Sequence, residues 1–338
     1  MKISFLVTYY NQKEYVKQSI DSILAIDKPC DWEILVGDDG STDGTIDEVK
    51  KYIKEYPNNI RLYVMSRDAE TKYDSVKRAS ANRINILDKS EGDFFCIIDG
   101  DDYYCDVDFI KEAIDIFIKF EDISIVMFGQ RKIRDGIWED ECKFPEGRNK
   151  NFVTKEEYLK KYYIHSGACV YKKNFDVQRL EFISSLGYYD DNDIVVNNLN
   201  YGDIYSVHKV IYAYRQTGVS VFTSMNALEQ AVLNVKGLDI DIQLLSKTFE
   251  DILIKRNAVS ILTAFIWKEY LLDILGTEKY KKYINNIRSN EVISFSIFYF
   301  ERLNRLERKK LYCIIKKCIF YRWRFFIKET IRYLGRKR

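Results

Sequence analysis

The sequence predicts an α/β protein with a mainly parallel central sheet, helices on both faces of that sheet, and a C-terminal helical region. Two observations lead to this prediction. Short apolar runs alternate with stretches of helical periodicity through the first half of the chain, which is typical of parallel strands joined by covering helices. Beyond residue 224, almost every stretch has apolar residues at helical spacing instead.

Strands and helices alternate in order along the first 120 residues. Strands are expected at the apolar runs of residues 3–8, 32–37, 60–65 and 93–98. Helices are expected from Asn11 to residue 24, from Thr42 or Asp43 to about residue 56, and at residues 75–87 and 109–120. Further strands at residues 124–128, 167–171 and 204–214 flank polar, irregular stretches. A domain boundary near Ser224 would separate residues 1–224 from residues 225–338.

Composition excludes several classes of protein. The 338 residues are 46% hydrophobic, which is enough to build a sizeable core. The 7 cysteines include no CxxC pair and there are 2 histidines, so a disulfide framework, a zinc ribbon or a histidine-rich metal site is not expected. No apolar run reaches the roughly 18 uncharged residues of a spanning helix. We therefore expect a cytoplasmic protein that does not cross a membrane.

The charge is unevenly distributed. Residues 301–338 contain 14 Lys or Arg against three acidic residues, while the net charge of the whole chain is +2, so the first 300 residues carry −9. This is not the even basic face of a nucleic-acid-binding protein. The tail has Trp323 and Phe326 on one helical face and basic residues on the other, the pattern of a helix bound to an anionic membrane surface. The alternative is a C-terminal helix packed on the first domain.

Two acidic clusters follow predicted strands. Asp38 and Asp39 come after the second strand, and Asp99, Asp101 and Asp102 come after the fourth. Ligands of open parallel sheets bind outside the C-terminal ends of the strands, so these carboxylates are expected to converge there. Like charges in one crevice favour a neutralising cation, and hard oxygen ligands favour Mg²⁺ or Mn²⁺. Residues 41–44 also fit turn and capping chemistry, and we expect that role for them.

Three segments together resemble family 2 glycosyltransferases of the GT-A fold. They are residues 4–11 (SFLVTYYN), 33–45 (EILVGDDGSTDGT) and 92–104 (GDFFCIIDGDDYY), in that order along the chain. The resemblance covers roughly residues 1–224 and implies a GT-A catalytic domain there. It also implies a nucleotide-sugar donor, usually UDP-linked, and inversion of the anomeric centre.

The resemblance also implies roles for particular residues. Residues of the nucleoside pocket would be Thr8, Tyr9 and Tyr10, and those reaching the base and ribose would be Asp38 and Asp39. The segment Asp99-Gly100-Asp101 matches the DxD motif, in which Asp101 would hold the metal ion and Asp99 would contact the ribose or the ion. Arg83 stands where many relatives have a basic residue; the alternative is a solvated helix charge.

The catalytic base is sought in the second half of the domain. Inversion requires a carboxylate that accepts the proton of the acceptor hydroxyl. Residues 188–194 (YYDDNDI) resemble the family's base segment, with Asp193 aligned best, Asp191 second and Asp190 third. The alternative role of these acids is capping and first-turn stabilisation of a helix. His165 precedes the acceptor-side strand and is expected to have a structural or acceptor-contacting role.

These features together predict a metal-dependent inverting glycosyltransferase. Its acceptor would be a hydroxyl of a cell-surface glycan precursor (capsule, lipopolysaccharide or lipooligosaccharide, or teichoic type), lipid-linked, with the enzyme peripheral on the inner face of the cytoplasmic membrane. Two alternatives are a non-catalytic glycan-binding or scaffold protein on the same fold and a sugar nucleotidyltransferase. The second would need a glycine-rich, basic phosphate loop after the first strand, and residues 9–12 (YYNQ) do not provide one.

Overall fold

The computed structural model describes residues 1–68, 70–134, 136–139, 144, 151–161, 164–217, 227–245, 247–250, 252–253 and 256–257. The chain divides into two units, Met1–Ser224 with Asp239–Leu253, and Met225–Leu238 with Ile254–Arg338. The predicted basic tail at residues 301–338 lies outside the described residues, as does most of the predicted helical region. Within the described part of the chain, no helix is both long enough and apolar enough to cross a bilayer.

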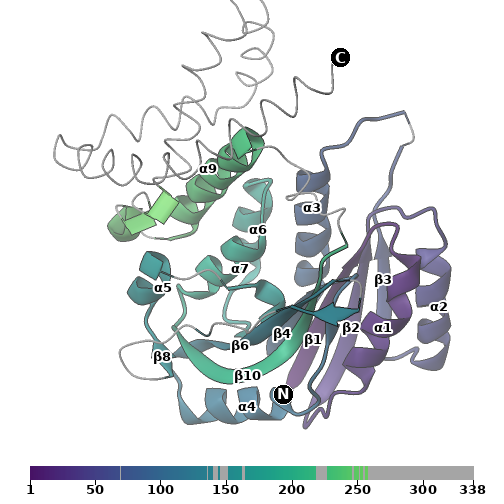
Figure 1. Ribbon diagram of the computed structural model, residues 1–338, viewed down its shortest axis with the longest axis horizontal. Helices are drawn as coiled ribbons and strands as arrows, with labels where there is room; N and C mark the ends of the chain where they lie inside the picture. The colour runs from purple at the N-terminus through teal and green to yellow at the C-terminus, as the bar shows by residue number, and fades with distance from the viewer. Residues whose placement is uncertain are drawn as a thin grey trace, which may run out of the picture. The chain divides into compact units, whose positions relative to one another are not determined.

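Helices and strands alternate along the first unit (Figure 1). The strands are β1 (Lys2–Tyr9), β2 (Asp31–Asp38), β3 (Ile60–Val64), β4 (Phe94–Asp99), β5 (Tyr103–Tyr104), β6 (Ile123–Arg134), β7 (Ile137–Trp138), β8 (Phe152–Val153), β9 (Cys169–Lys172) and β10 (Asp203–Arg215). The helices are α1 (Lys13–Leu24), α2 (Thr45–Glu55), α3 (Ser75–Asp88), α4 (Phe109–Lys119), α5 (Lys155–Lys161), α6 (Val177–Ser185), α7 (Asp191–Asn198) and α9 (Ala227–Leu244), the last of which continues from one unit into the other. Two short 3₁₀ helices are η1 (Ser166–Ala168) and η2 (Lys247–Phe249).

One sheet joins the described strands in the order β3-β2-β1-β4-β9-β6-β10-β5, with β7 on β6 and β8 on β10. β1 pairs in parallel with β2 and β4, and β2 pairs in parallel with β3. β9 is antiparallel to both of its neighbours, β4 and β6, and β10 is again parallel to β6. The strands β4, β6 and β10 therefore all end at the same edge of the sheet. The predicted mainly parallel α/β architecture is confirmed.

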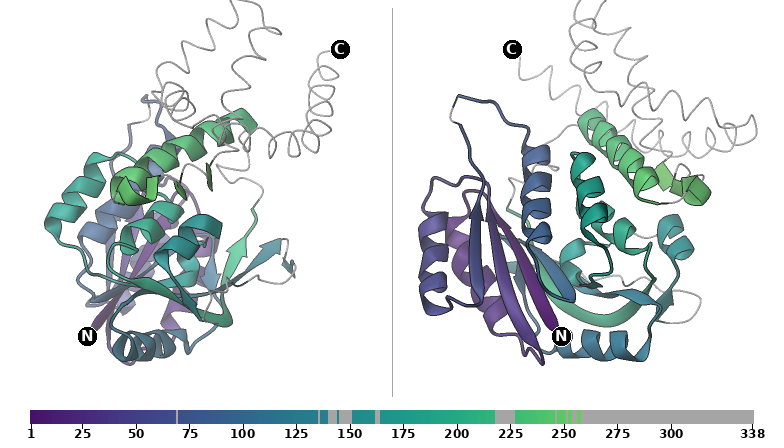
Figure 2. Two further views of the ribbon diagram at one scale, coloured as in Figure 1. Left: turned by 90° about the vertical axis from the view of Figure 1, so that its left-hand side faces the viewer. Right: turned by 180° about the vertical axis from the view of Figure 1, so that it is seen from behind.

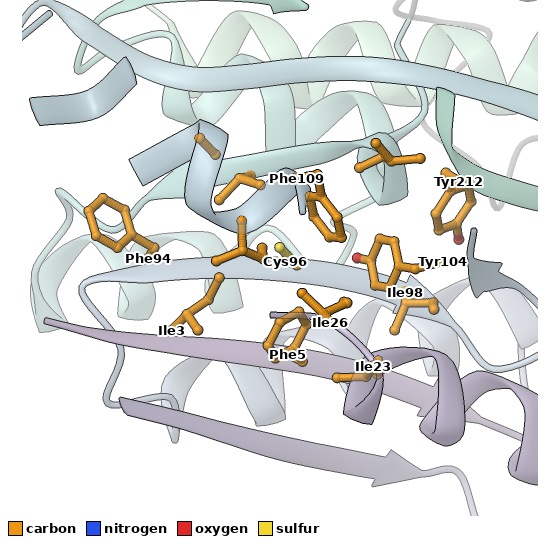
Figure 3. Packing of buried hydrophobic residues seen from close by; sticks show 14 of the residues in the cluster. Ile3, Phe5, Ile23, Ile26, Phe94, Cys96, Ile98, Tyr104, Phe109 and Tyr212 are labelled. Atoms are coloured by element: carbon orange, nitrogen blue, oxygen red, sulfur yellow. The ribbon is translucent and has the colours of Figure 1, made fainter. Parts of the chain in front are cut away.

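Alternate residues of the strands face the two layers of helices, because successive side chains of a strand point to opposite faces. Ile3, Phe5 and Val7 of β1 join one core cluster with the apolar faces of α1, α2 and α4. Figure 3 shows the centre of this cluster, where Tyr104, Phe109 and Tyr212 gather beside β4. On the other face, α3 packs on β1 and β2 and against α6, and α7 contacts β6 (Figures 1 and 2).

The predicted strands and helices of the first 120 residues are present in the structure, and the main differences are a longer strand and additional short elements. The strand expected at residues 124–128 continues as β6 to Arg134, where it forms a hairpin with β7. Helices α5, α6 and α7 and the short strands β5, β7 and β8 were not expected from periodicity. Each is short, from two to nine residues, so it spans too few repeats for an apolar period to stand out.

Candidate active site

The two acidic clusters meet at the edge of the sheet where the parallel strands end. In the register of the sheet, Thr8 of β1 lies opposite Asp99 of β4, and Tyr9 lies opposite Asp38 of β2. The Thr8 hydroxyl donates a hydrogen bond to the Asp99 carboxylate at 3.3 Å. The predicted convergence of the two clusters is thus present in the fold, and it follows directly from the parallel arrangement of β1, β2 and β4.

A tight turn holds the DxD segment on the end of β1. The Gly100 amide donates to the Thr8 carbonyl at 2.9 Å, and the Asp102 amide donates to the Asp99 carbonyl at 2.9 Å. A Cβ atom at position 100 would lie 2.1 Å from the ring of Tyr9, so only glycine fits there. Tyr9 is itself buried, and its hydroxyl hydrogen-bonds Ser19. Gly100 and Tyr9 therefore shape the turn by packing.

The environment of Asp101 suits a divalent cation. Burial, together with the nearby negative charge of Asp99, raises the pKa of Asp101 to about 6. Burial is the larger cause of this shift, and the charge of Asp99 adds to it; a bound cation would offset the negative charge of the two carboxylates. The oxygen ligands of Asp99 and Asp101 are those that Mg²⁺ and Mn²⁺ prefer. The residues present thus fit such an ion.

The third acid of the segment, Asp102, has a structural environment. Its side chain is buried and accepts hydrogen bonds from the Tyr212 hydroxyl at 2.7 Å and from the Arg215 amide at 2.6 Å. Burial, followed by the charges of Asp101 and Asp99, raises its pKa. Asp102 therefore ties the end of β10 to the DxD segment and brings the Arg215 side chain to the rim of the site.

Arg83 links the DxD segment to the start of α7. Its side chain is only 11% exposed. It donates to Asp99 at 3.0 Å and to Asp190 at 3.1 Å, and it lies 3.6 Å from Asp191. Burial alone would lower its pKa, but these three carboxylates together raise it. The alternative of a solvated helix charge does not describe this side chain, which joins residues more than one hundred positions apart.

Asp193 closes the first turn of α7. The Asp190 side chain caps the helix, and the Asp193 carboxylate accepts the Asp190 backbone N–H at 2.7 Å, which completes a capping box. Asp193 is 1% exposed and its side chain also hydrogen-bonds Asp241. Burial, then the charge of Asp241, raises the pKa of Asp193 well above its usual value. The carboxylate of Asp193 thus lies away from solvent, inside the protein.

Asp191 is the acid of this helix that faces the DxD segment. Its carboxylate accepts a hydrogen bond from the Ser166 hydroxyl at 2.7 Å. Carboxylate or imidazole atoms of Asp191, Asp99 and His165 all lie within 4.8 Å of one another. Burial raises the pKa of Asp191, against the opposing positive charge of Arg83. At Asp99 the charge and hydrogen bond of Arg83 outweigh burial and hold the pKa below the usual value.

His165 is positioned by backbone and aromatic contacts. Its Nδ1 accepts the Gly167 amide at 3.2 Å, and its ring lies 5.1 Å from Tyr212 and 4.9 Å from Tyr214, centroid to centroid. A Cβ at Gly167 would lie 2.3 Å from the Tyr212 ring, so the 3₁₀ turn η1 can approach β10 only with glycine at this position. The turn thereby places His165 and Ser166 against the two acids.

A second polar cluster lies on the β2–β3 side of the site. Asp39 forms ion pairs with Arg67, at 2.6 Å, and with Arg78, and the Arg67 guanidinium stacks on the Tyr10 ring at 4.0 Å. Tyr10 is 43% exposed and accepts a hydrogen bond from Arg67 on its hydroxyl. The sequence analysis did not identify the two arginines. They follow no motif, and only the fold brings Arg67 of the β3–α3 loop and Arg78 of α3 to Asp39.

Asp38 and residues 41–44 make the turn that supports this cluster. Burial raises the pKa of Asp38, which is fully buried and accepts the Ser41 amide at 2.7 Å. Ser41 accepts the Asn11 amide and Asp43 accepts amides of Lys13 and Thr45. The turn and capping role expected for residues 41–44 agrees with these bonds.

The fold and the site together define a glycosyltransferase of the GT-A type: strands ending in a DxD turn, with a helix bearing carboxylates beside it. The chain belongs to glycosyl transferase family 2, whose family model matches residues 4–177. The predicted family and the GT-A fold are therefore confirmed.

Individual relatives agree with this assignment. A poly(ribitol-phosphate) β-glucosyltransferase of Bacillus spizizenii is 31% identical over 104 residues, 30% of this chain and 15% of its own length. Another curated relative, an uncharacterised protein of Mycobacterium bovis, is 23% identical over 172 residues, 51% of this chain and 47% of its own length. The chain thus spans about half or less of the length of these relatives.

Solved structures share the fold. The S. aureus TarS fragment 1–349 in complex with UDP superimposes with a TM-score of 0.58 at 19% identity, covering 92% of this chain and 86% of that one. The same fragment is also known in complex with UDP-GlcNAc. The mannosyltransferase PcManGT of Pyrobaculum calidifontis, in complex with GDP-Man and Mn²⁺, gives a TM-score of 0.50 at 14% identity over 88% of this chain and 84% of that one.

Proposed function

We propose that the protein is a metal-dependent, inverting glycosyltransferase that moves a sugar from a UDP-sugar to a hydroxyl of a cell-surface glycan precursor. One observation carries the proposal. The carboxylate of Asp191 lies within 4.8 Å of that of Asp99, at the edge where the strands β1, β2 and β4 end. A proton acceptor and a diphosphate-binding segment so close together are what an in-line displacement at a sugar carbon requires.

The proposed base is Asp191 rather than Asp193, which the sequence placed first. A base needs one carboxylate oxygen that can reach the acceptor hydroxyl, and Asp193 is 1% exposed and used in the capping box. Asp191 keeps 15% of its side chain exposed and faces the DxD segment. The raised pKa of Asp191 makes it a stronger proton acceptor, and the Ser166 hydroxyl and Arg83 keep its carboxylate oriented.

Asp101, with Asp99, would hold the divalent cation, Mn²⁺ or Mg²⁺. An ion bound there offsets the negative charge that develops on the departing nucleoside diphosphate. The chain itself contributes positive charge on either side, through Arg83 at Asp99 and through Arg215, which lowers the pKa of Asp101 against the effect of burial. PcManGT, which has the same fold, was solved with Mn²⁺.

The cluster around Asp39 supports uridine as the nucleoside. The carboxylate of Asp39 is an acceptor with a guanidinium donor on each side, from Arg67 and Arg78. The edge of uracil has the complementary order, because its N3–H donor lies between two carbonyl acceptors. Cytosine lacks a donor at N3, and guanine has two adjacent donors. The partly exposed ring of Tyr10 offers a face for stacking the base.

The acceptor and the location rest on the relatives and on the tail. The curated relative from Bacillus spizizenii is named for transfer to poly(ribitol phosphate), which supports a glycan precursor of teichoic type. The net charge of +11 in residues 301–338 supports a peripheral location on the inner face of the cytoplasmic membrane. Each basic residue near an anionic membrane surface contributes about 1 kcal/mol to the free energy of membrane binding.

Release of nucleoside diphosphate tests the proposal. The protein is incubated with a panel of UDP-, GDP- and CDP-sugars, with Mn²⁺, with Mg²⁺ or with EDTA, and released nucleotide is measured with and without glycan acceptors. UDP release that needs a divalent cation supports the proposal. A non-catalytic binding protein would release nothing from any donor, and a nucleotidyltransferase would instead release pyrophosphate when given a nucleoside triphosphate and a sugar phosphate.

A further inference from the structure

A group of aromatic and arginine side chains extends outward from the DxD segment, and we call it the Trp138 cluster. The Arg215 guanidinium lies 4.7 Å from the ring of Tyr15 and 5.6 Å from that of Tyr103. The Tyr103 ring is 6.5 Å from Trp138, and the Arg131 guanidinium lies over Trp138 at 5.3 Å. From Arg215 to Arg131, the cluster thus has two adjacent rings, Tyr103 and Trp138, with a cation at each end.

One end of the cluster is part of the reaction site. The Arg215 Nε donates to the backbone carbonyl of Asp101 at 2.6 Å, and its amide donates to Asp102. The other end is the hairpin of β6 and β7, where Trp138 lies opposite Ile133 in the register. The side chain of Trp138 is 37% exposed and that of Ile137 is 72% exposed. A molecule bound at Asp101 could therefore continue over the cluster towards this hairpin.

Among the residues that the structure describes, the two cations of the cluster form no ion pair with a carboxylate. Neither Arg131 nor Arg215 forms an ion pair with an acidic side chain of the described residues, and the buried Nε of Arg131 has no hydrogen-bond partner among them. Arg134, on the same strand as Arg131, differs because it pairs with Glu139 at 3.2 Å. Guanidinium groups that form no ion pair with a described carboxylate, beside a substrate site, are suited to bind an anion.

We propose that the Trp138 cluster is the acceptor subsite and that it selects an anionic glycan chain. The aromatic rings can pack against the apolar C–H faces of sugar or polyol units, and the guanidinium forks can bind the phosphate or carboxylate of neighbouring units. A chain whose sugar or polyol units lie between charged groups matches two rings that lie between two cations. This inference rests on the proposed glycosyltransferase function and adds the chemical class of its acceptor.

The test compares acceptors of different charge. A poly(ribitol phosphate) oligomer, a uronic-acid oligosaccharide and a neutral oligosaccharide are used as acceptors for the wild type, Arg131→Gln and Trp138→Ala. We expect the KM for the preferred anionic acceptor to rise about tenfold or more in both variants, with donor hydrolysis in the absence of acceptor unchanged. The oligomer that shows the effect identifies phosphate or carboxylate as the recognised group. An equal KM change for the neutral acceptor in Arg131→Gln would overturn anion selection.

Matched variants separate recognition from folding. Arg134→Gln, which removes an arginine paired within the protein, should leave the KM for every acceptor unchanged. Trp138→Phe keeps an aromatic face and should recover most of the affinity that Trp138→Ala loses. Binding of the oligomers to wild type is also followed by Trp fluorescence, without turnover. If donor hydrolysis is absent in the wild type while anionic oligomers bind and Arg131→Gln weakens them, the proposed function fails but the subsite stands. Unchanged binding in both Arg131→Gln and Trp138→Ala overturns the subsite.

Discussion

The carboxylate of Asp193 accepts the backbone N–H of Asp190 at 2.7 Å, so the acid that the sequence ranks first as base closes the first turn of the helix that carries Asp191. The two acids are two positions apart and on different sides of α7. Asp191 faces Asp99 and His165, whereas Asp193 is buried against Asp241. This division of roles leads to the first prediction.

Asp191→Asn should lower turnover by about 10²–10⁴, because the amide keeps the size of the side chain but accepts no proton. Donor affinity should be unchanged. Asp193→Asn should change turnover by less than about tenfold, since an amide oxygen can still accept the Asp190 amide. Steady-state kinetics and donor binding by calorimetry check both variants. If Asp193→Asn loses turnover and Asp191→Asn keeps it, Asp193 and not Asp191 is the base.

Asp101→Ala should abolish turnover and the cation-dependent part of nucleoside diphosphate binding, because Asp101 is the proposed main ligand of the cation. Its fold should remain, since the backbone carbonyl of residue 101 still accepts the hydrogen bond from Arg215. The matched control is Asp108→Ala, an exposed acid at the start of α4. Calorimetry of UDP with and without Mn²⁺ measures the effect. Full transfer by a folded Asp101→Ala protein would remove Asp101 from the metal site.

Arg67→Gln and Arg78→Gln should each weaken UDP binding by about tenfold, because each removes a charged donor beside Asp39. CDP and GDP binding should change less, so the preference for UDP should narrow. Lys72→Gln is the control, since Lys72 lies exposed in the same loop. Titrations of each variant with UDP, CDP and GDP measure these changes in affinity. A uniform loss for all three nucleotides would mean that the arginines attract phosphate charge and do not read the base.

Asp241→Asn should make the protein more stable at high pH. Burial and the charge of Asp241 raise the pKa of Asp193, so the folded state keeps a proton that the unfolded chain releases above about pH 4. The stability that this proton contributes to the folded state is therefore lost as the pH rises towards the raised pKa of Asp193 in the folded protein. Removing the second charge should raise Tm by about 2 °C or more at pH 8 and by less at pH 5.

Asp239→Asn is the control for that experiment, because Asp239 lies on helix α9 together with Asp241. Thermal unfolding followed by circular dichroism at the two pH values gives the comparison. An equal change in Tm at pH 5 and pH 8 would show that the charge of Asp241 is not what destabilises the native state.

Deleting residues 309–338 should release the protein from anionic vesicles, because the tail carries the positive charge that attracts such surfaces. Binding by the intact protein should weaken as salt rises, since charges are screened over about 8 Å at physiological ionic strength. Transfer to a soluble acceptor should survive, while transfer to a lipid-linked acceptor should fall. Co-sedimentation measures binding. Loss of activity on every acceptor would instead indicate a tail that packs on the catalytic domain.

The sequence was sufficient to bring the strand-end residues together and insufficient to place the side chains around them, such as Arg67 and Arg78, for a physical reason. Thr8, Asp38 and Asp99 end parallel strands, and the ends of such strands meet whatever the connecting loops do. The choice between Asp191 and Asp193 could not be made in the same way, because an acid in the first turn of a helix suits both capping and catalysis. Only the burial of Asp193 beside Asp241 separates these two roles.

The antiparallel strand β9 separates β4 from β6 in the sheet. β4 and β6 run the same way but lie two strand spacings apart, about 10 Å. β9 pairs with β4 only at Phe94 and Phe95, which are at the start of β4 and far from the carboxyl end of β4. The opening left above it, between the ends of β4 and β6, is filled by the turn η1, which carries Ser166. Because the Ser166 hydroxyl hydrogen-bonds Asp191, a longer or shorter turn at this point would shift the proposed base relative to Asp99 while leaving β1, β2 and the turn after β2 unchanged.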